Sequence, residues 1–182
     1  MTAIPTTSFL KENEKTEFGN HNSDVKHISI ILTQFDDMFS SIIRFVAKQE
    51  YTHVSLALEG YDKAFTFNYR GFALEKPYTL FRRKKGTNMI LEVSDEQYKI
   101  IERQVLNFQR QSSTLKYTHL GVIFCALNIS ITIKKRYFCS QFVAEVLKNS
   151  GIHLRKESQL YLPQNLYQEL LNNKQVYKII NN

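Results

Sequence analysis

Cysteine and glycine are scarce in this chain of 182 residues, and their scarcity excludes several classes of protein. The chain has two cysteines, Cys125 and Cys139, which are too few for the disulfide framework of a small secreted domain. None of its six glycines falls in the spacing of a phosphate-binding loop. The two cysteines and the scattered histidines do not make a zinc-ligand set. We therefore expect neither a metal ion nor another cofactor.

Long apolar runs are also missing. The best candidate for a membrane span, Leu120 to Ile133, is interrupted by Asn128, Ser130 and Thr132. The N-terminus has no basic segment followed by an apolar one, so we expect no signal peptide. These absences predict a cytoplasmic protein without a transmembrane segment.

What is present is an ordinary globular composition with an excess of positive charge. Hydrophobic residues make up 43% of the chain, which is typical of one domain with a real core. The formal net charge is +7, and much of it lies in two runs, Arg82 to Lys85 and Lys134 to Arg136. Such charge favours an anionic substrate or partner, the alternative being a solvated surface. No nucleic-acid-binding motif accompanies either run, so we expect no nucleic-acid partner.

The pattern along the chain predicts a tail followed by one α+β domain. Residues 1–24 are polar and lack periodicity, which predicts a mobile tail before a domain over residues 25–182. Alternating or β-branched apolar residues predict strands at residues 27–33, 53–59, 63–69, 88–93 and 176–180. Helices are expected after Asp36 or Asp37, after a capping box at Ser94, over residues 117–127, from Cys139 and from Pro163. Because the segment 117–127 is apolar, we expect its helix to be buried.

Cys139 is the candidate nucleophile. It lies at the predicted start of a helix, where free backbone N–H groups and the positive end of the helix dipole favour a thiolate. The basic run Lys134 to Arg136 immediately precedes it and acts in the same direction. The same N–H groups are placed to stabilise an oxyanion. Cys125 lies in an apolar stretch, and we interpret it as a small buried hydrophobic residue.

Two segments carry a resemblance to a known family. The first, YTHVSLAL, covers residues 51–58 and contains His53, and the second, YFCSQFVAEVL, covers residues 137–147 and contains Cys139. They resemble the two signature blocks of the permuted NlpC/P60 (papain-like) superfamily, and most closely those of its YiiX/YebB-like proteins. As in that group, the histidine strand precedes the cysteine helix, and the resemblance spans most of residues 27–170. It implies a circularly permuted papain-like fold, in which an antiparallel sheet carries the nucleophile helix on one face.

The resemblance also implies roles for individual residues. Cys139 would be the nucleophile and His53 its base, with a polar residue on the next strand orienting the imidazole. Thr66 best matches that polar position and Asn68 is the runner-up. Because that strand contains no acidic residue or histidine, the expected partner of His53 is neutral. Substrate contacts are expected from four residues, which are Tyr51, Asn68, Arg136 and Ser140.

The implied activity is that of a cysteine hydrolase acting on an amide or isopeptide bond, such as one in a peptidoglycan-type peptide. Two alternatives stay open. One is a lipid-directed acyltransferase or acyl hydrolase on the same fold, and the other is a binding module without catalysis. Reactivity of Cys139 separates the binding module from both enzymes, and the acceptor used separates the two enzymes from each other.

Overall fold

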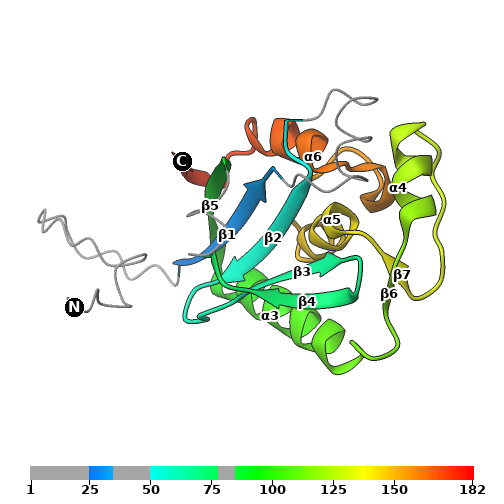
Figure 1. The fold of residues 1–182 in the computed structure, drawn as a ribbon. Helices are drawn as coiled ribbons and strands as arrows, with labels where there is room; N and C mark the ends of the chain where they lie inside the picture. Colours follow the sequence, from blue (N-terminus) through cyan, green and yellow to red (C-terminus); the bar gives the residue numbers. More distant parts are fainter. Residues whose placement is uncertain (1–24, 35–49, 78–84) are drawn as a thin grey trace, which may run out of the picture.

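The computed structural model describes residues 25–34, 50–77 and 85–182 (Figure 1). Within these ranges the chain has an α+β architecture, as predicted. The expected mobile tail over residues 1–24 and the expected helix after Asp36 or Asp37 lie outside the described residues.

Six strands form one antiparallel sheet in the order β4-β3-β2-β1-β5-β8. Their bounds are β1 (Val25–Thr33), β2 (His53–Leu58), β3 (Ala64–Asn68), β4 (Gly71–Glu75), β5 (Gly86–Ser94) and β8 (Val176–Asn181). Strand β1 is central and pairs with β5 along its whole length and with β2 over Ile28 to Thr33. Strand β4 is a finding of the structure, because no strand was expected between residues 70 and 87.

Four helices lie within the described residues: α3 (Asp95–Arg110), α4 (His119–Ala126), α5 (Cys139–Asn149) and α6 (Pro163–Leu170). A short 3₁₀ helix, η1 (Ser158–Leu160), precedes α6. The capping box is present, since the Ser94 hydroxyl accepts from the Gln97 N–H at 3.1 Å and the Gln97 side chain accepts from the Ser94 N–H at 3.2 Å. Pro163 occupies the first turn of α6, where a missing N–H costs little.

Helices α3 and α5 pack on one face of the sheet. Apolar strand residues such as Ile30 and Leu56 form a single buried cluster with Ile101 of α3 and Val143 of α5. Figure 1 shows α5 lying alongside β2 and β3. Eight of the eleven residues of α5 are buried, which fixes the position of its first residue, Cys139.

Helix α4 is less buried than its apolar sequence predicts. Val122 and Cys125 on one side are buried, whereas the side chains of Leu120 and Ile123 are 61% and 42% exposed. The expectation of a buried helix over residues 117–127 is therefore correct for one side and wrong for the other. The reason is that the described part of the chain packs against α4 on one side only.

The chain enters and leaves the α4 region through two short strands. Strand β6 (Lys116–Tyr117) precedes α4, and β7 (Arg136–Tyr137) leads directly into α5. The two strands pair in parallel. The segment between them, which contains α4, therefore projects at the side of the molecule (Figure 1). No helix in the parts of the chain described here is long and apolar enough to span a bilayer.

Candidate active site

The candidate site lies where the first residue of α5 meets the first residue of β2. Cys139 begins α5, His53 begins β2, and their side chains are hydrogen-bonded to each other. Both residues are nearly buried, with exposed fractions of 5% for Cys139 and 6% for His53. The structure thus brings together the two residues that the sequence analysis paired.

The other side of the imidazole is held by a carboxylate that the sequence analysis missed. Nε2 of His53 lies 3.0 Å from Oε2 of Glu75, the last residue of β4. The Ser55 hydroxyl donates to the same carboxylate oxygen at 2.7 Å and lies 3.3 Å from Nε2. Because an ionised carboxylate only accepts hydrogen bonds, Nε2 carries a proton. We therefore assign Nδ1, the remaining ring nitrogen, to the contact with Cys139.

Thr66 lies beside the ring but has a closer partner. Its Oγ1 is 3.4 Å from Nε2 of His53, whereas its hydroxyl donates to the backbone carbonyl of Val54 at 2.7 Å. The β2–β3 ladder begins only at Leu56, so this hydroxyl joins the two strands ahead of their backbone pairing. Thr66 therefore lies within hydrogen-bond reach of the ring, while the closer contact with Nε2 belongs to Glu75, an acidic partner that the sequence did not lead us to expect.

Glu75 was missed because its strand was missed. Strand β4 alternates Phe72 and Leu74 with Ala73 and Glu75, which is a strand signal only five residues long. The turn before it offers a second signal, because the Asn68 side chain accepts from the Arg70 N–H at 2.9 Å in an Asx-type turn. A hairpin interpretation of residues 64–75 would have set Glu75 opposite the small residue Ala64.

The glycine that opens β4 is also required by its surroundings. Gly71 has a φ of +111°, in the region that favours glycine. A Cβ atom at this position would come within 2.7 Å of the Leu115 carbonyl oxygen. The hairpin that delivers Glu75 can therefore approach the segment before β6 closely.

The charges of the site stabilise one another. Burial alone would lower the pKa of the His53 imidazole, but the hydrogen bonds to Cys139 and Glu75, together with their charges, raise it to about 10. Burial would raise the pKa of Glu75, but its hydrogen bond with His53, the charge of His53 and the Ser55 hydroxyl lower it. His53 and Glu75 therefore form an imidazolium–carboxylate pair at neutral pH. A positively charged ring therefore lies beside the Cys139 sulfur.

The first turn of α5 supplies further donors. Phe138 caps the helix without a side-chain hydrogen bond, and the first N–H that bonds back along the helix is that of Phe142, which donates to the Phe138 carbonyl at 3.0 Å. The N–H groups of Cys139, Ser140 and Gln141 thus stand outside the helical ladder. Donors at this position next to a nucleophile are suited to stabilising an oxyanion.

Tyr51 and Asn68, two of the residues expected to contact substrate, have structural partners. The hydroxyl of Tyr51 is buried and lies 2.7 Å from Oγ1 of Thr87. The Asn68 side chain is engaged with the Arg70 N–H in the β3–β4 turn. Neither of these hydrogen bonds involves His53.

Arg136 and Ser140 lie close to the nucleophile in the chain and differ in accessibility. Arg136 is exposed on β7, with Nη1 3.5 Å from the Tyr117 carbonyl oxygen, so its guanidinium is available to an anionic group. Ser140 is fully buried, and its Oγ has no hydrogen-bond partner among the described residues. Its burial argues against substrate contact through the hydroxyl, while its backbone N–H remains one of the first-turn donors.

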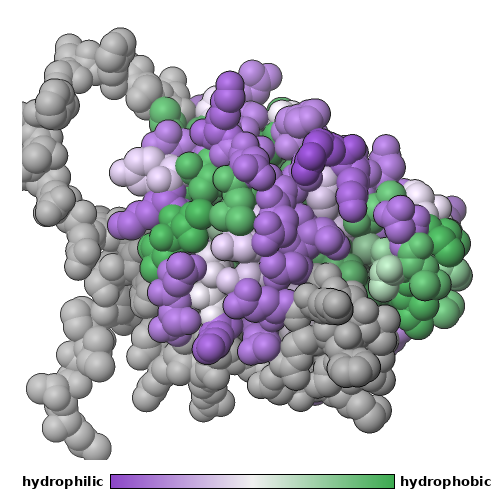
Figure 2. Space-filling view, turned by 90° about the horizontal axis from the view of Figure 1, so that it is seen from above, coloured by the Kyte–Doolittle hydropathy of each residue, from purple (hydrophilic) through white to green (hydrophobic). Residues whose placement is uncertain are grey.

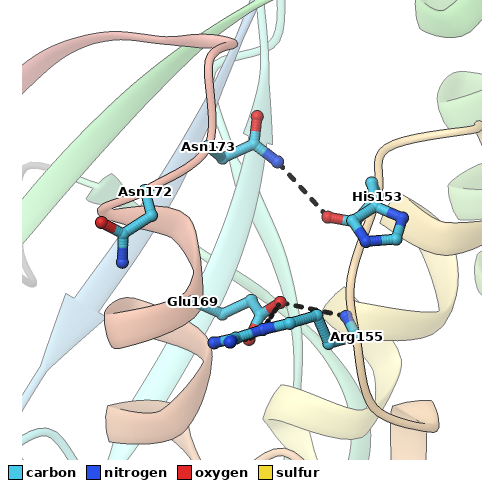
Figure 3. Close-up of a pocket in the computed structure, with 5 residues that line it drawn as sticks. All are labelled: His153, Arg155, Glu169, Asn172 and Asn173. Carbon is cyan, nitrogen blue, oxygen red and sulfur yellow. Dashed lines mark hydrogen bonds and ion pairs between the residues drawn. The ribbon is translucent and has the colours of Figure 1, made fainter.

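A separate polar hollow lies between the segment after α5 and the end of α6 (Figure 3). It is lined by His153, Arg155, Glu169, Asn172 and Asn173. The Arg155 guanidinium pairs with the Glu169 carboxylate at 3.0 Å, and the Asn173 amide donates to the His153 carbonyl at 3.4 Å. Its charged groups satisfy each other, and it shares no residue with the site around His53.

No protein-family model matches the chain, and no curated protein matches it either. Among residues 25–34, 50–77 and 85–182, no group of three or more His, Cys, Asp or Glu side chains is arranged to hold a metal ion. The functional assignment therefore depends on the geometry around Cys139 and His53.

Proposed function

We propose that this protein is a cysteine hydrolase with a circularly permuted papain-like fold of the NlpC/P60 type, related to the YiiX-like proteins, and that it cleaves an amide or isopeptide bond. One observation carries the proposal. The buried imidazole of His53 is hydrogen-bonded on one side to Cys139, at the start of a helix, and on the other side to the carboxylate of Glu75. This is the nucleophile–base–orienter arrangement of covalent acyl-transfer enzymes.

The chain order of the three residues supports the permuted fold. His53 on β2 and Glu75 on β4 both precede Cys139 on α5. This is the order expected of the permuted group, in which the histidine strand comes before the cysteine helix. The antiparallel sheet with α5 packed on one face is compatible with that architecture.

In the proposed reaction Cys139 starts as a thiolate, because its proton already resides on Nδ1 of the His53 imidazolium. The thiolate attacks the substrate carbonyl, and the oxygen of the tetrahedral intermediate accepts hydrogen bonds from first-turn N–H groups of α5. The intermediate collapses to a thioester as His53 returns the proton to the leaving nitrogen. Glu75 keeps the ring oriented and stabilises its positive charge throughout.

Water completes the cycle. His53 removes a proton from the incoming water, the hydroxide attacks the thioester carbonyl, and Cys139 leaves as the thiolate. An anionic group on the substrate, such as the carboxylate of a stem peptide, would be attracted by Arg136, which is exposed three residues before the nucleophile. We propose such a substrate as the preferred one.

A second candidate function is an acyl hydrolase or acyltransferase that acts on lipids. The observation that favours it is the exposed aliphatic side of α4, the last helix before β7 and the nucleophile. The catalytic residues would be the same, and the two functions would differ in the group attached to the carbonyl and in the acceptor.

A panel of amide, ester and thioester substrates tests the proposal, with Cys139→Ser and Cys125→Ser as matched variants. The wild type and Cys125→Ser should turn over at least one substrate at equal rates, while Cys139→Ser loses activity by a factor on the order of 10⁶. Product analysis in the presence of an amine or an alcohol separates hydrolysis from acyl transfer. Equal activity of the two variants would exclude Cys139 as the nucleophile, and no turnover together with an unreactive Cys139 would leave a binding module instead.

A further inference from the structure

The segment that contains the candidate nucleophile and the α4 region before it has no acidic residue. Residues 116–144 contain no Asp or Glu, although the whole chain has 17 such residues. The same segment contains four cationic residues, which are Lys116, Lys134, Lys135 and Arg136. All four are exposed, and none of them forms an ion pair with a carboxylate in the described part of the chain. Their charge is therefore available to an external partner.

The same segment exposes a set of large aliphatic side chains. We call this set the α4 face, and its members with their exposed fractions are Leu120 (61%), Ile123 (42%), Leu127 (64%), Ile129 (44%) and Ile131 (37%). Figure 2 shows hydrophobic residues gathered at the right-hand side of the molecule, which is the side of α4 in Figure 1. Single exposed aliphatic residues are ordinary, but a contiguous group marks an interaction surface.

The α4 face is not needed to build the core. The opposite side of α4 supplies the buried residues Val122 and Cys125, which pack with Phe138 and Leu162. The exposed members are therefore available to an external partner without loss of internal packing. Two residues with left-handed backbone, Asn128 (φ 57°) and Lys135 (φ 59°), flank the loop that presents Ile129 and Ile131.

We infer that the α4 face docks on the surface of an anionic lipid membrane, with its aliphatic side chains entering the interface and the four cations contacting lipid headgroups. Aliphatic residues bordered by Lys and Arg, without acidic residues, are the pattern of interfacial membrane binding. A protein partner is less well matched, because anchors at protein interfaces are enriched in Trp, Tyr and Arg, whereas these are Leu and Ile. The docking does not depend on the proposed chemistry, but it would bring Cys139 next to the membrane surface, because β7 leads from the cations into α5.

The test is co-sedimentation of the full chain with vesicles. Vesicles of phosphatidylcholine mixed with phosphatidylglycerol should bind the protein, vesicles of phosphatidylcholine alone should bind it much less, and added salt should weaken the binding. Leu120→Gln and Leu127→Gln should each weaken binding about tenfold, since each loses the burial of one leucine. Lys134→Gln with Lys135→Gln should weaken it roughly 25-fold, about fivefold for each lysine.

Matched controls come from β8, which lies on the other side of the molecule from α4 (Figure 1). Ile180 is 41% exposed and serves as the control for Ile123 at 42%, while Tyr177 at 65% is the control for Leu120. Ile180→Gln and Tyr177→Gln should leave vesicle binding unchanged, whereas Ile123→Gln should weaken it. Cys139→Ser should bind vesicles as the wild type does, so vesicle binding and hydrolysis can fail independently.

Three results would overturn the inference. One is absence of binding to the anionic vesicles, and another is equal loss in the α4 and β8 variants. The third is concentration-dependent self-association that Leu120→Gln abolishes while vesicles bind nothing, which would make the α4 face an interface between copies of the chain.

Discussion

The two cysteines of this protein are alike in exposure but differ in their position on a helix and in their neighbours. Both are free, both are nearly buried, with exposed fractions of 5% for Cys139 and 6% for Cys125, and both lie on helices. Cys139 is the first residue of its helix and contacts a charged imidazole. Cys125 is the seventh residue of an eight-residue helix and packs among Val122, Phe138 and Leu162.

The difference shows that position and partner, rather than exposure, distinguish the two thiols. Burial raises the pKa of Cys125 to about 12, because its surroundings offer little compensation for a negative charge. At neutral pH Cys125 therefore stays a thiol. Cys139 instead has first-turn N–H groups that lie outside the helical ladder, and the His53 imidazolium is beside it.

Removing the histidine should make Cys139 resemble Cys125. We expect His53→Ala to lower turnover by about 10²–10⁴-fold, because it removes the general acid–base group. His119→Ala is the control, since His119 is exposed on α4. Initial rates with the best substrate of the panel give the comparison, and circular dichroism checks that the variant remains folded. Equal rates for His53→Ala and the wild type would remove His53 from the mechanism.

The next effect in size concerns Glu75. We expect Glu75→Gln to lower kcat by about 10- to 100-fold, the equivalent of one charge-assisted hydrogen bond. Thr66→Val should lower it only about threefold, because Thr66 makes the longer contact with the ring. Steady-state kinetics of both variants decide which residue orients His53. A larger loss in Thr66→Val than in Glu75→Gln would restore the neutral triad predicted from the sequence.

These two residues also show what the sequence could predict and what it could not. Cys139 and His53 lie in contiguous segments with strong local patterns, so their elements were placed within a residue or two. The position of Glu75 depends on a five-residue strand and on the pairing of a hairpin. The residues next to it in the chain do not indicate a contact with His53. Contacts created by strand register are weakly encoded in local sequence.

The predicted burial of α4 was wrong on one side of the helix for a related reason. Hydrophobicity predicts that a segment has apolar contacts, but it does not say whether the chain itself or an external surface provides them. Val122 and Cys125 have partners within the described residues, whereas Leu120 and Leu127 are more than half exposed. The sequence alone therefore predicted the helix and over-predicted its burial.

A smaller effect is expected on stability. Thr66→Val should lower the free energy of unfolding by about 2 kcal/mol, because the buried Val54 carbonyl loses the hydroxyl that satisfies it. Thr66→Ser keeps that hydroxyl and is the matched control. Urea denaturation of the two variants and the wild type measures the difference. A stability of Thr66→Val equal to that of Thr66→Ser would show that the Val54 carbonyl does not depend on this contact.

The last expected effect is a change of stability with pH. The pKa of His53 is raised from 6.5 to about 10, so its contribution to stability is fully present below pH 6.5 and is lost as the pH rises towards 10. The pKa of Glu75 is lowered from 4.5, so its contribution is present above pH 4.5 and is lost in more acidic solution. The difference in unfolding free energy between the wild type and Glu75→Gln should therefore be largest between pH 4.5 and pH 6.5. A difference that grows towards pH 10 would contradict the ion pair.

Competitive alkylation tests the central claim most directly. The wild-type protein is treated with limiting iodoacetamide at neutral pH, and the labelled peptides are mapped by mass spectrometry. We predict that Cys139 is labelled well before Cys125, and that His53→Ala slows the labelling of Cys139 while leaving Cys125 unchanged. Equal labelling of the two cysteines, or faster labelling of Cys125, would contradict the assignment of Cys139 as the nucleophile.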